Sequence, residues 1–449
     1  PEGTVNVDYY LVNYTTQNPG WIRLQQYTPT EAQANTTKVV FEPSFAEARP
    51  KKCRMWFYLF KQLTSIEGIE YLNTSECETM DYMFSMCLNL ERVDVSGLNT
   101  KKVTNMEQMF ANTTKLTSLT FGKDFSTESL AASTSCQSMF ANDVKLRFVD
   151  FLASDHTDAI VGANIMYMFG SLNNEGTTVV YLPHGKQDIT NRSNFVYSYN
   201  GDETDLRCPY YYSKDTIDIE LPYDFRTNMA EYKRKVTTNN KGTVILPYDF
   251  TSNARIRAYT LNDEYTDFMW FESTETVAAH TPFVFRNLTK STTASTTVDF
   301  TQKDNSNNFG ITVYATRDTQ LYGPYTTSTP LGGWTIKGIY VKEKSTCDNR
   351  IYYIQGDKFV RANGETLTGY PHRAFFEGQW AQTPNAGAPS LEIKFSDDNN
   401  TTAIEGIETE ETAETQAIFD TTGRKLSALK KGVNIIRLKN GTTKKVIIK

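Results

Sequence analysis

One short pattern that returns through the first half of the chain restricts its fold more than any other feature. Each copy has a Cys, Met or Ile, two variable residues, a Met or Trp, and then a phenylalanine. The phenylalanines are 27, 26, 30 and 29 residues apart, at Phe57, Phe84, Phe110, Phe140 and Phe169. A repeat of this length cannot bury its apolar face alone, so neighbouring units must stack. The pattern predicts a solenoid of about five repeats.

A second apolar pattern follows each of the first four copies, six, nine and eleven residues after the phenylalanine. Its members are Leu63/Ile66/Gly68, Leu90/Val93/Val95, Leu116/Leu119/Phe121 and Leu146/Val149/Phe151. The spacing L-x-x-L-x-L is the strand signature of leucine-rich repeats. We therefore expect each unit to contain a short helix or turn with the Met-Phe pair, a polar corner and a short strand.

The Met, Phe and Cys residues of these units are expected to pack in the interior rather than form a cofactor or partner site. Met and unpaired Cys both serve as apolar core residues. Cysteines stand at positions that other units fill with apolar residues, which favours core thiols over disulfides. The equivalent residues are Cys53, Met80, Met106 and Cys136 at one position and Cys77 and Val103 at another.

The whole chain is expected to be mixed but mostly β, and to contain several domains, because 449 residues exceed one ordinary hydrophobic core. Closely spaced strand-like runs indicate a sandwich-like domain in the second half, and a run of glutamates indicates a linker after it. The expected segments are an N-terminal β cap at 1–35, a leucine-rich-repeat solenoid at 36–200, an all-β sandwich-like domain at 205–395, an acidic linker at 396–415 and a small C-terminal β module at 416–449.

Two features of segment 205–395 are candidates for function. The pentapeptide Leu-Pro-Tyr-Asp-Phe occurs at 221–225 and again at 246–250. Its acids, Asp224 and Asp249, are favoured as turn residues over paired catalytic carboxylates. Aromatic residues form a candidate sugar-stacking platform, although strand alternation predicts about half of them in the core. These are Tyr210, Tyr211, Tyr212, Trp270, Tyr322, Tyr325, Trp334 and Trp380.

Two stretches of the sequence resemble known bacterial surface proteins. The second unit and its continuation read Met80-x-x-Met83-Phe84, Cys87, Leu90-x-x-Val93 and Leu98-Asn99-Thr100-x-x-Val103. This resembles the leucine-rich repeats of BspA-like bacterial surface proteins with a Met-x-x-Met-Phe signature, also found in mycoplasma lipoproteins, over about residues 36–200. The runs at 417–426, 431–436 and 444–449 resemble the β-module that ends many exported Bacteroides-type proteins. The resemblance implies an extracellular or cell-surface, outer-membrane-associated location and an adhesive role, with no catalytic residues.

The sequence argues against several other classes of function. A net charge of −6 gives no general attraction to nucleic acid, and no apolar run is long enough for a transmembrane segment. The four histidines lack helical metal-site spacing, and no C-x-x-C, phosphate-binding glycine loop or G-x-S-x-G occurs. We expect no enzyme activity, no cofactor and no metal site. A chain that starts at Pro1 rather than Met also predicts a removed leader.

The strands of the repeats nominate a binding face. In L-x-x-L-x-L strands the apolar side chains point inward, so the residues between them point outward. The outward set predicted to bind a partner is Glu67, Arg92, Asp94, Ser118, Thr120, Phe148 and Asp150. Neighbouring strands lie about 4.8 Å apart, so the acids of this column need compensation. Arg92 and Arg147 within the chain, or a cation or basic partner surface, are the alternatives.

These observations predict a non-enzymatic surface or secreted binding protein, with a host or extracellular protein or a glycan as ligand of the repeat face. The alternative is a carbohydrate-binding accessory protein of a polysaccharide-capture system that reads glycan through the β domain. A glycoside-active enzyme is the least favoured interpretation.

Overall fold

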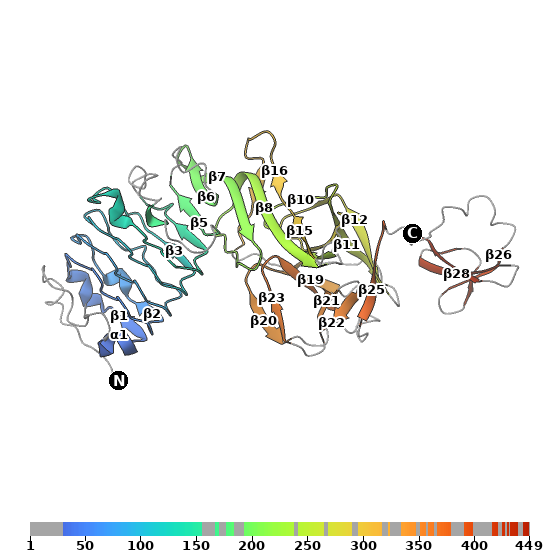
Figure 1. The fold of residues 1–449 in the computed structure, drawn as a ribbon, viewed down its shortest axis with the longest axis horizontal. Coiled ribbons are helices and arrows are strands. Elements are labelled where there is room, and N and C mark those ends of the chain that lie inside the picture. Colours follow the sequence, from blue (N-terminus) through green and yellow to red (C-terminus); the bar gives the residue numbers. More distant parts are fainter. Residues whose placement is uncertain are drawn as a thin grey trace.

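The structure is a computed structural model, and most of its regular structure is β (Figure 1). It describes residues 30–154, 167–169, 177–183, 193–237, 241–264, 268–289, 295–316, 322–323, 334–346, 351–355, 358–362, 366–378, 390–397, 415–420, 424–426, 429–430, 432–438 and 443–448. The predicted mostly β fold class is confirmed at this level. In Figure 1 the repeat units lie at one end of the molecule and the sheets of the second half follow them.

The described chain begins with a short helix at the end of the segment predicted as a β cap, residues 1–35. Helix α1 (Glu31–Asn35) starts at Thr30, whose hydroxyl accepts the Gln33 backbone N–H while the Gln33 side chain accepts the Thr30 N–H. This reciprocal capping box favours a helix over a strand at this point. Residues 1–29 of the predicted β cap lie outside the described residues. Strand β1 (Lys38–Val40) follows the helix and pairs in parallel with β2 (Ser65–Glu67).

The first four copies of the Met-Phe pattern form hydrogen-bonded turns rather than a short helix, whereas Tyr167 and Met168 of the fifth copy are helical. Every second backbone N–H along these stretches donates to the next unit, as from Cys53 to Thr79 and from Met80 to Asn105, at 2.9 and 2.8 Å. Alternate N–H groups instead close turns within the unit, as from Trp56 to the Cys53 carbonyl at 3.3 Å. The backbone groups are therefore satisfied by neighbouring units, which requires the units to lie side by side.

Two residues in each unit adopt left-handed backbone conformations. At the first position φ is 57°, 57°, 50° and 56°, in Met55, Tyr82, Gln108 and Ser138. At the second position φ is 65°, 65°, 63° and 62°, in Leu59, Met86, Asn112 and Asn142. Each non-glycine residue in this region costs about 1 kcal/mol. The same residues donate hydrogen bonds to the following unit, as from Tyr82 to Glu107 at 2.9 Å, which offsets that cost.

A column of phenylalanine rings runs through the interior of the stacked units. Successive rings stack with centroid distances of 5.2, 5.1, 5.8 and 4.8 Å, from Phe57 through Phe84, Phe110 and Phe140 to Phe169. The Met residues beside them, such as Met83 and Met109, are 0% exposed. The predicted core role of the repeated Met, Phe and Cys residues is confirmed.

One sheet continues from the repeat units into the second half of the chain. Its order is β15-β8-β7-β6-β5-β4-β3, with β16 and β17 also pairing with β8. The strands are β3 (Ser118–Thr120), β4 (Phe148–Asp150), β5 (Val179–Leu182), β6 (Phe195–Tyr199), β7 (Asp202–Lys214), β8 (Phe225–Thr237), β15 (Ser295–Asp299), β16 (Gln302–Lys303) and β17 (Ile311–Val313). Strands β3 to β6 pair in parallel, and a turn then joins β6 to the antiparallel β7. The boundary predicted at 200–205 lies at this turn, but the sheet crosses it.

A second large sheet packs against the first. Its order is β18-β19-β24-β21-β22-β25-β12-β11-β14-β9. The strands are β9 (Lys241–Val244), β11 (Ile256–Glu264), β12 (Phe268–Thr274), β14 (Phe283–Asn287), β18 (Tyr322–Gly323), β19 (Trp334–Ile339), β21 (Ile351–Gln355), β22 (Lys358–Arg361), β24 (Arg373–Gly378) and β25 (Ser390–Phe395). Side chains of both sheets, such as Tyr211 and Phe285, share one buried cluster. On the other face of the second sheet, Tyr259 and Val284 belong to a further cluster.

Smaller sheets complete the described structure. Strand β10 (Phe250–Thr251) pairs with β13 (Thr276–Val277), and β20 (Glu343–Thr346) with β23 (Thr366–Gly369). Near the C-terminus, β27 (Lys425–Leu426), β26 (Thr415–Phe419), β28 (Gly432–Leu438) and β29 (Thr443–Ile448) form a sheet in that order. Asp397, in the segment predicted as a linker, accepts a hydrogen bond from Tyr259 at 2.8 Å, and residues 398–414 lie outside the described residues.

Candidate binding face

The face nominated from the sequence is built from short strands whose central residue points into the repeat core. Ile66, Leu119 and Val149 pack in that core. The residues on either side of them therefore point away from it. Register pairs Val40 with Glu67, and Thr120 with Asp150, and the bridge between Val95 and Phe121 places Asp94 next to Thr120. The face consists of two columns, Lys38, Ser65, Arg92, Ser118, Phe148 and Val179 in one, and Val40, Glu67, Asp94, Thr120, Asp150 and Tyr181 in the other.

The first four positions of each column are open to solvent or half-buried. Glu67 is paired with Lys38 at 2.6 Å, and both side chains are about half exposed, at 58% and 48%. Asp94 accepts hydrogen bonds from the Ser96 N–H at 2.9 Å and hydroxyl at 2.6 Å. Arg92 and Thr120 are exposed and Ser118 is half-buried. Compensation of Glu67 thus comes from Lys38 of its neighbouring strand, a residue outside the predicted binding set.

The last positions of both columns are buried, which corrects the expectation that Phe148 and Asp150 face solvent. Phe148 is 2% exposed and packs against Tyr181 at a ring distance of 6.5 Å. Asp150 is 3% exposed and accepts a hydrogen bond from the Tyr223 hydroxyl at 2.8 Å. Both lie under side chains of the following domain, including Phe225. The unbroken apolar run of residues 179–182 indicates this burial in the sequence, since strands that are buried on both faces lack alternating polar residues.

The charges at this covered end follow from burial. Burial raises the pKa of Asp150, against the opposing effect of hydrogen bonds from Leu152 N–H and the Tyr223 hydroxyl. Arg147 does not compensate Asp150 as expected, because its Nη2 lies 3.2 Å from Asp218 of the following domain. Arg147 Nε and Nη1 are buried without a hydrogen-bond partner, beside a small pocket also lined by Lys214 and Asp218. This junction is a packed contact between two parts of one chain.

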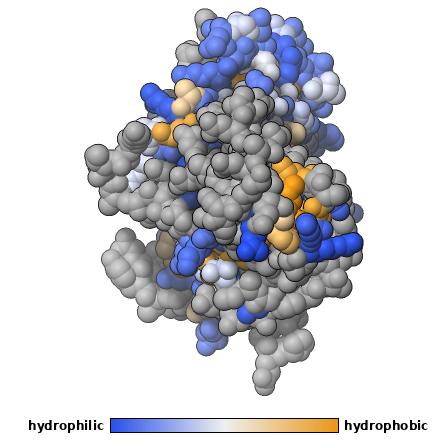
Figure 2. All heavy atoms as spheres, turned by 90° about the vertical axis from the view of Figure 1, so that its right-hand side faces the viewer, coloured by the Kyte–Doolittle hydropathy of each residue, from blue (hydrophilic) through white to orange (hydrophobic). Residues whose placement is uncertain are grey.

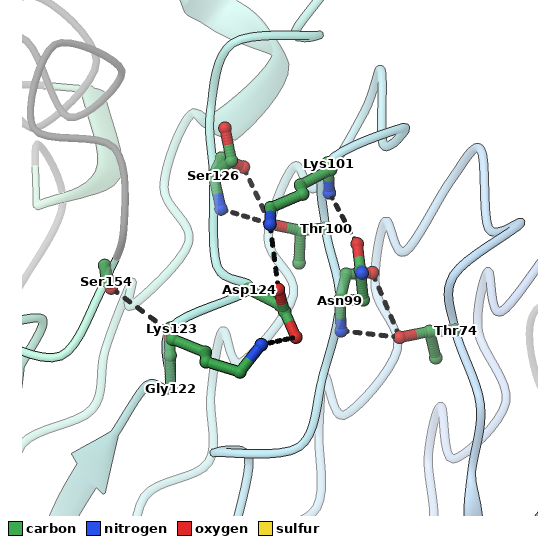
Figure 3. Close-up of polar contacts among 9 residues, drawn as sticks. All are labelled: Thr74, Asn99, Thr100, Lys101, Gly122, Lys123, Asp124, Ser126 and Ser154. Atoms are coloured by element: carbon green, nitrogen blue, oxygen red, sulfur yellow. Dashed lines mark hydrogen bonds and ion pairs between the residues drawn. The ribbon is translucent and has the colours of Figure 1, made fainter.

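The corners that lead away from the strands are polar and internally satisfied (Figure 3). Buried hydroxyls bridge successive units: Thr74 Oγ1 donates to the Asn99 carbonyl at 3.0 Å and Thr100 Oγ1 to the Ser126 carbonyl at 2.7 Å. Lys101 and Lys123 contact Asp124 at 2.8 and 3.0 Å. Hydrogen bonds from these two lysines lower the pKa of Asp124. The corner groups therefore neutralise each other and hold units together.

The β domain contains a buried polar cluster that the sequence did not reveal. His372 is 0% exposed, with Nδ1 2.9 Å from the Ile245 carbonyl and Nε2 3.0 Å from Ser213 Oγ. The carbonyl can only accept, so Nδ1 carries the proton and Ser213 donates to Nε2. Burial lowers the pKa of His372 to about 3. A buried, weakly basic imidazole beside a buried serine is a structural pair rather than an activated nucleophile.

The duplicated Leu-Pro-Tyr-Asp-Phe segments also have structural roles. Asp224 accepts the Ala315 N–H at 2.7 Å, and Asp249 accepts the Ala279 N–H at 2.8 Å. The carbonyls of the preceding leucines also accept in matching fashion, Leu221 from Thr316 N–H at 2.9 Å and Leu246 from His280 N–H at 2.8 Å. Both aspartates thus join their segments to distant parts of the chain, which is a structural role but not the local turn that was expected, and the two copies are equivalent junctions.

Most of the aromatic candidates in the described residues are core residues. Tyr211 and Trp334 are 1% exposed, and Trp270 is 6% exposed. Tyr210 and Tyr212 are half-buried on the other face of β7, with ring centroids 6.5 Å apart and planes inclined by 38°. Tyr325 and Trp380 lie outside the described residues, as does the side chain of Tyr322. Only this tyrosine pair therefore remains as an open platform among the described candidates.

The described ranges contain no group of three or more His, Cys, Asp or Glu placed to hold a metal ion. None of the helices that the structure describes has the length and apolar character needed to cross a lipid bilayer. Seen from the C-terminal end, the described surface is mostly hydrophilic with hydrophobic residues in small groups (Figure 2).

Comparison with known protein families finds a match over the repeat units. Residues 51–173 match the family described as "Mycoplasma protein of unknown function, DUF285". These residues include all five Met-Phe pairs or their Trp-Phe counterpart. No curated protein and no solved structure matches the chain.

Proposed function

We propose that this chain is a non-enzymatic bacterial surface or secreted binding protein, built on a leucine-rich-repeat solenoid of the BspA-like type. The proposal takes the units between Cys53 and Phe169 as solenoid repeats and the following sheets as a sandwich-like domain. Its ligand is a host or extracellular protein, or a glycan, bound on the open part of the outward face.

The observation that supports this proposal most is the change in burial along one face. The columns are solvent-exposed or half-buried from Lys38 to Thr120 and buried from Phe148 to Tyr181. The covered part shows that side chains in these positions can be packed against a β-rich surface, here that of the same chain. The open part has the same strand geometry but mixed charges, with Glu67, Arg92 and Asp94 available to a polar partner. Exposed charges of both signs give specificity more than affinity.

The experiment probes arrays of immobilised extracellular-matrix proteins and glycans with the full chain. A triple variant, Glu67→Lys, Arg92→Glu and Asp94→Lys, is expected to lose at least tenfold in affinity for any array member that the wild type binds, equivalent to about 1.4 kcal/mol. The matched control exchanges Glu76 and Lys102, an exposed pair 2.7 Å apart at a corner outside the columns. Equal binding by the triple variant and the wild type would falsify the assignment of this face.

One observation supports glycan capture by the β domain as the second candidate. Tyr210 and Tyr212 present two half-exposed rings on one side of β7, and sugar rings stack on such aromatic faces. In this case Tyr210→Ala with Tyr212→Ala removes binding to the glycan array, while the triple variant leaves it unchanged. Tyr370→Ala, which removes another exposed tyrosine of the second half, serves as the control.

A further inference from the structure

Two buried thiols of the first repeat unit lie close to each other. Cys53 and Cys77 are both 0% exposed and belong to the same buried cluster, where each thiol shifts the pKa of the other. Both residues also converge on the Thr79 carbonyl oxygen, which lies 2.9 Å from the Cys53 backbone nitrogen and 3.2 Å from Cys77 Sγ. This shared acceptor holds the two cysteines in a defined relative position.

The repeat itself shows what normally fills these two positions. Cys77, Val103 and Leu130 are equivalent, because each N–H donates to the carbonyl of a threonine three residues earlier, at 2.9, 2.9 and 3.2 Å. Cys53 and Met80 are equivalent, because each N–H donates to the next unit. The positions of Cys53 and Cys77 in the first unit are therefore those of Met80 and Val103 in the second unit. Apolar packing needs no thiol at either position, so a pair of cysteines supplies a chemistry that packing does not require.

We propose that Cys53 and Cys77 form an intrachain disulfide bond when the protein meets an oxidising environment. The oxidant is a disulfide, such as glutathione disulfide or the disulfide of a thiol oxidoreductase. The Cys77 thiolate attacks it to form a mixed disulfide, and Cys53 then displaces the bound thiol. The protein forms one S–S bond and loses two hydrogens, while the oxidant is reduced to two thiols that take up the two protons.

The environment of each sulfur assigns its role in this reaction. Burial raises the pKa of Cys53 well above its usual value, whereas the neighbouring Cys53 thiol lowers the pKa of Cys77. Cys77 is therefore the first thiolate. Because both sulfurs are buried, an external oxidant reaches them during folding or local opening of the first unit.

The crosslink would close the loop from Cys53 to Cys77, which spans most of the first repeat unit. A disulfide stabilises mainly by restricting the unfolded chain. In the folded chain this unit pairs through β2 with β1 on one side and donates hydrogen bonds to the second unit on the other. The bond therefore acts on the unfolded chain, at a unit whose folded position is already held on both sides.

The test uses the full chain in glutathione buffers of defined redox poise, followed by denaturing alkylation and intact-mass measurement. The chain has six cysteines, so the reduced protein takes up six alkyl groups and the oxidised protein is expected to take up four. Peptide mapping is expected to find Cys53 linked to Cys77. The oxidised form is also expected to unfold at a higher denaturant concentration than the reduced form.

Two variants that follow the repeat pattern keep the interior packed. Cys53→Met and Cys77→Val introduce the residues of the second unit, and each is expected to abolish the linked peptide and the redox-dependent stability. Cys87→Ser, at a buried cysteine that donates to the Phe57 carbonyl at 3.1 Å, is expected to retain both. Six alkyl groups under every oxidising condition, or a linked peptide between other cysteines, overturns the proposal.

Discussion

The repeat units and the β domain bury their interiors in different ways. The repeats place the same kind of side chain at the same position in each unit, as in the stacked rings of Phe84, Phe110 and Phe140. The β domain instead buries single polar groups with individual partners, such as His372 and Arg234. Arg234 is 5% exposed, with its guanidinium 4.5 Å above the Phe285 ring. Because the repeats pack periodically, the residue type at one position predicts the residue type at the equivalent position of the next unit. The polar groups of the β domain depend on contacts that occur only once, so they have no such pattern in the sequence.

Because the two interiors are built differently, different physical quantities limit the stability of the repeats and of the β domain. In the repeats, backbone hydrogen bonds join units and the side chains between them are mainly apolar, so volume is the sensitive quantity. Buried titratable groups add a pH dependence in each region, of opposite sign, through His372 in the β domain and Asp143 in the repeats. Five predictions test this comparison, from the largest expected effect to the smallest.

Removing one ring from the phenylalanine column should have the largest effect. Phe110→Ala leaves a cavity between Phe84 and Phe140, and is expected to lower the free energy of unfolding by about 3–5 kcal/mol. Chemical denaturation measures it, with Val144→Ala as the control at a valine that is 42% exposed. A loss below about 1 kcal/mol, the size expected when a site collapses fully, contradicts a close-packed column.

The two regions should respond to pH in opposite directions. His372 has a folded pKa of about 3, so below its ordinary pKa the unfolded chain binds a proton that the folded chain does not. The β domain therefore loses stability as pH falls from about 6.5 toward 3, by up to about 1.4 kcal/mol per unit for this group. His372→Asn suits the left-handed backbone at φ 60° and should flatten this slope.

Asp143 in the repeats should give the opposite slope. Burial raises its pKa well above the ordinary value, and its Oδ2 has no hydrogen-bond partner. Its contribution is therefore fully present at low pH and is lost as pH rises from about 4 through the folded pKa. Asp143→Asn should stabilise the protein at neutral pH and remove this slope. Urea denaturation of each variant across pH separates the two groups, and parallel slopes in all variants contradict the contrast.

Alanine substitutions of two glycines test how much room the surroundings leave for a side chain in each region. A Cβ on Gly122 would lie 1.9 Å from the Ser96 carbonyl oxygen, whereas one on Gly242 would lie 2.6 Å from Arg234 Nη2. Backbone joined to a neighbouring unit cannot move as a side-chain end can. Gly122→Ala should cost about 1–3 kcal/mol, and Gly242→Ala less, in thermal or urea unfolding. Equal losses indicate that Arg234 is held as rigidly as the repeat backbone.

The contact between the regions should give the smallest effect. Tyr223→Phe removes the hydrogen bond to Asp150 and is expected to cost about 1 kcal/mol in urea unfolding. A double-mutant cycle with Asp150→Asn isolates the pair. Additive losses contradict a coupling between these two side chains at the junction.

The sequence alone determined the periodic features of this protein. The Met-Phe spacing identified the buried Met, Phe and Cys residues and the places of the short strands, because a repeated environment selects the same residue type each time. Several strands of the second half were also predicted from apolar runs, such as the one at 268–271 within β12. The longer β8 was missed, since charged residues such as Lys233 and Lys235 line one of its faces.

Tertiary structure decided which part of the outward face is open. Asp94 and Asp150 occupy equivalent sequence positions, yet Asp94 is exposed and Asp150 is buried under Tyr223. Alternation along a strand fixes the direction of a side chain, but the surface that covers it comes from residues about 70 positions later, beyond the range of local periodicity. The cluster around His372 depends in the same way on contacts between distant strands. Local spacing therefore specified the repeat, and long-range packing selected the part of its face that remains available.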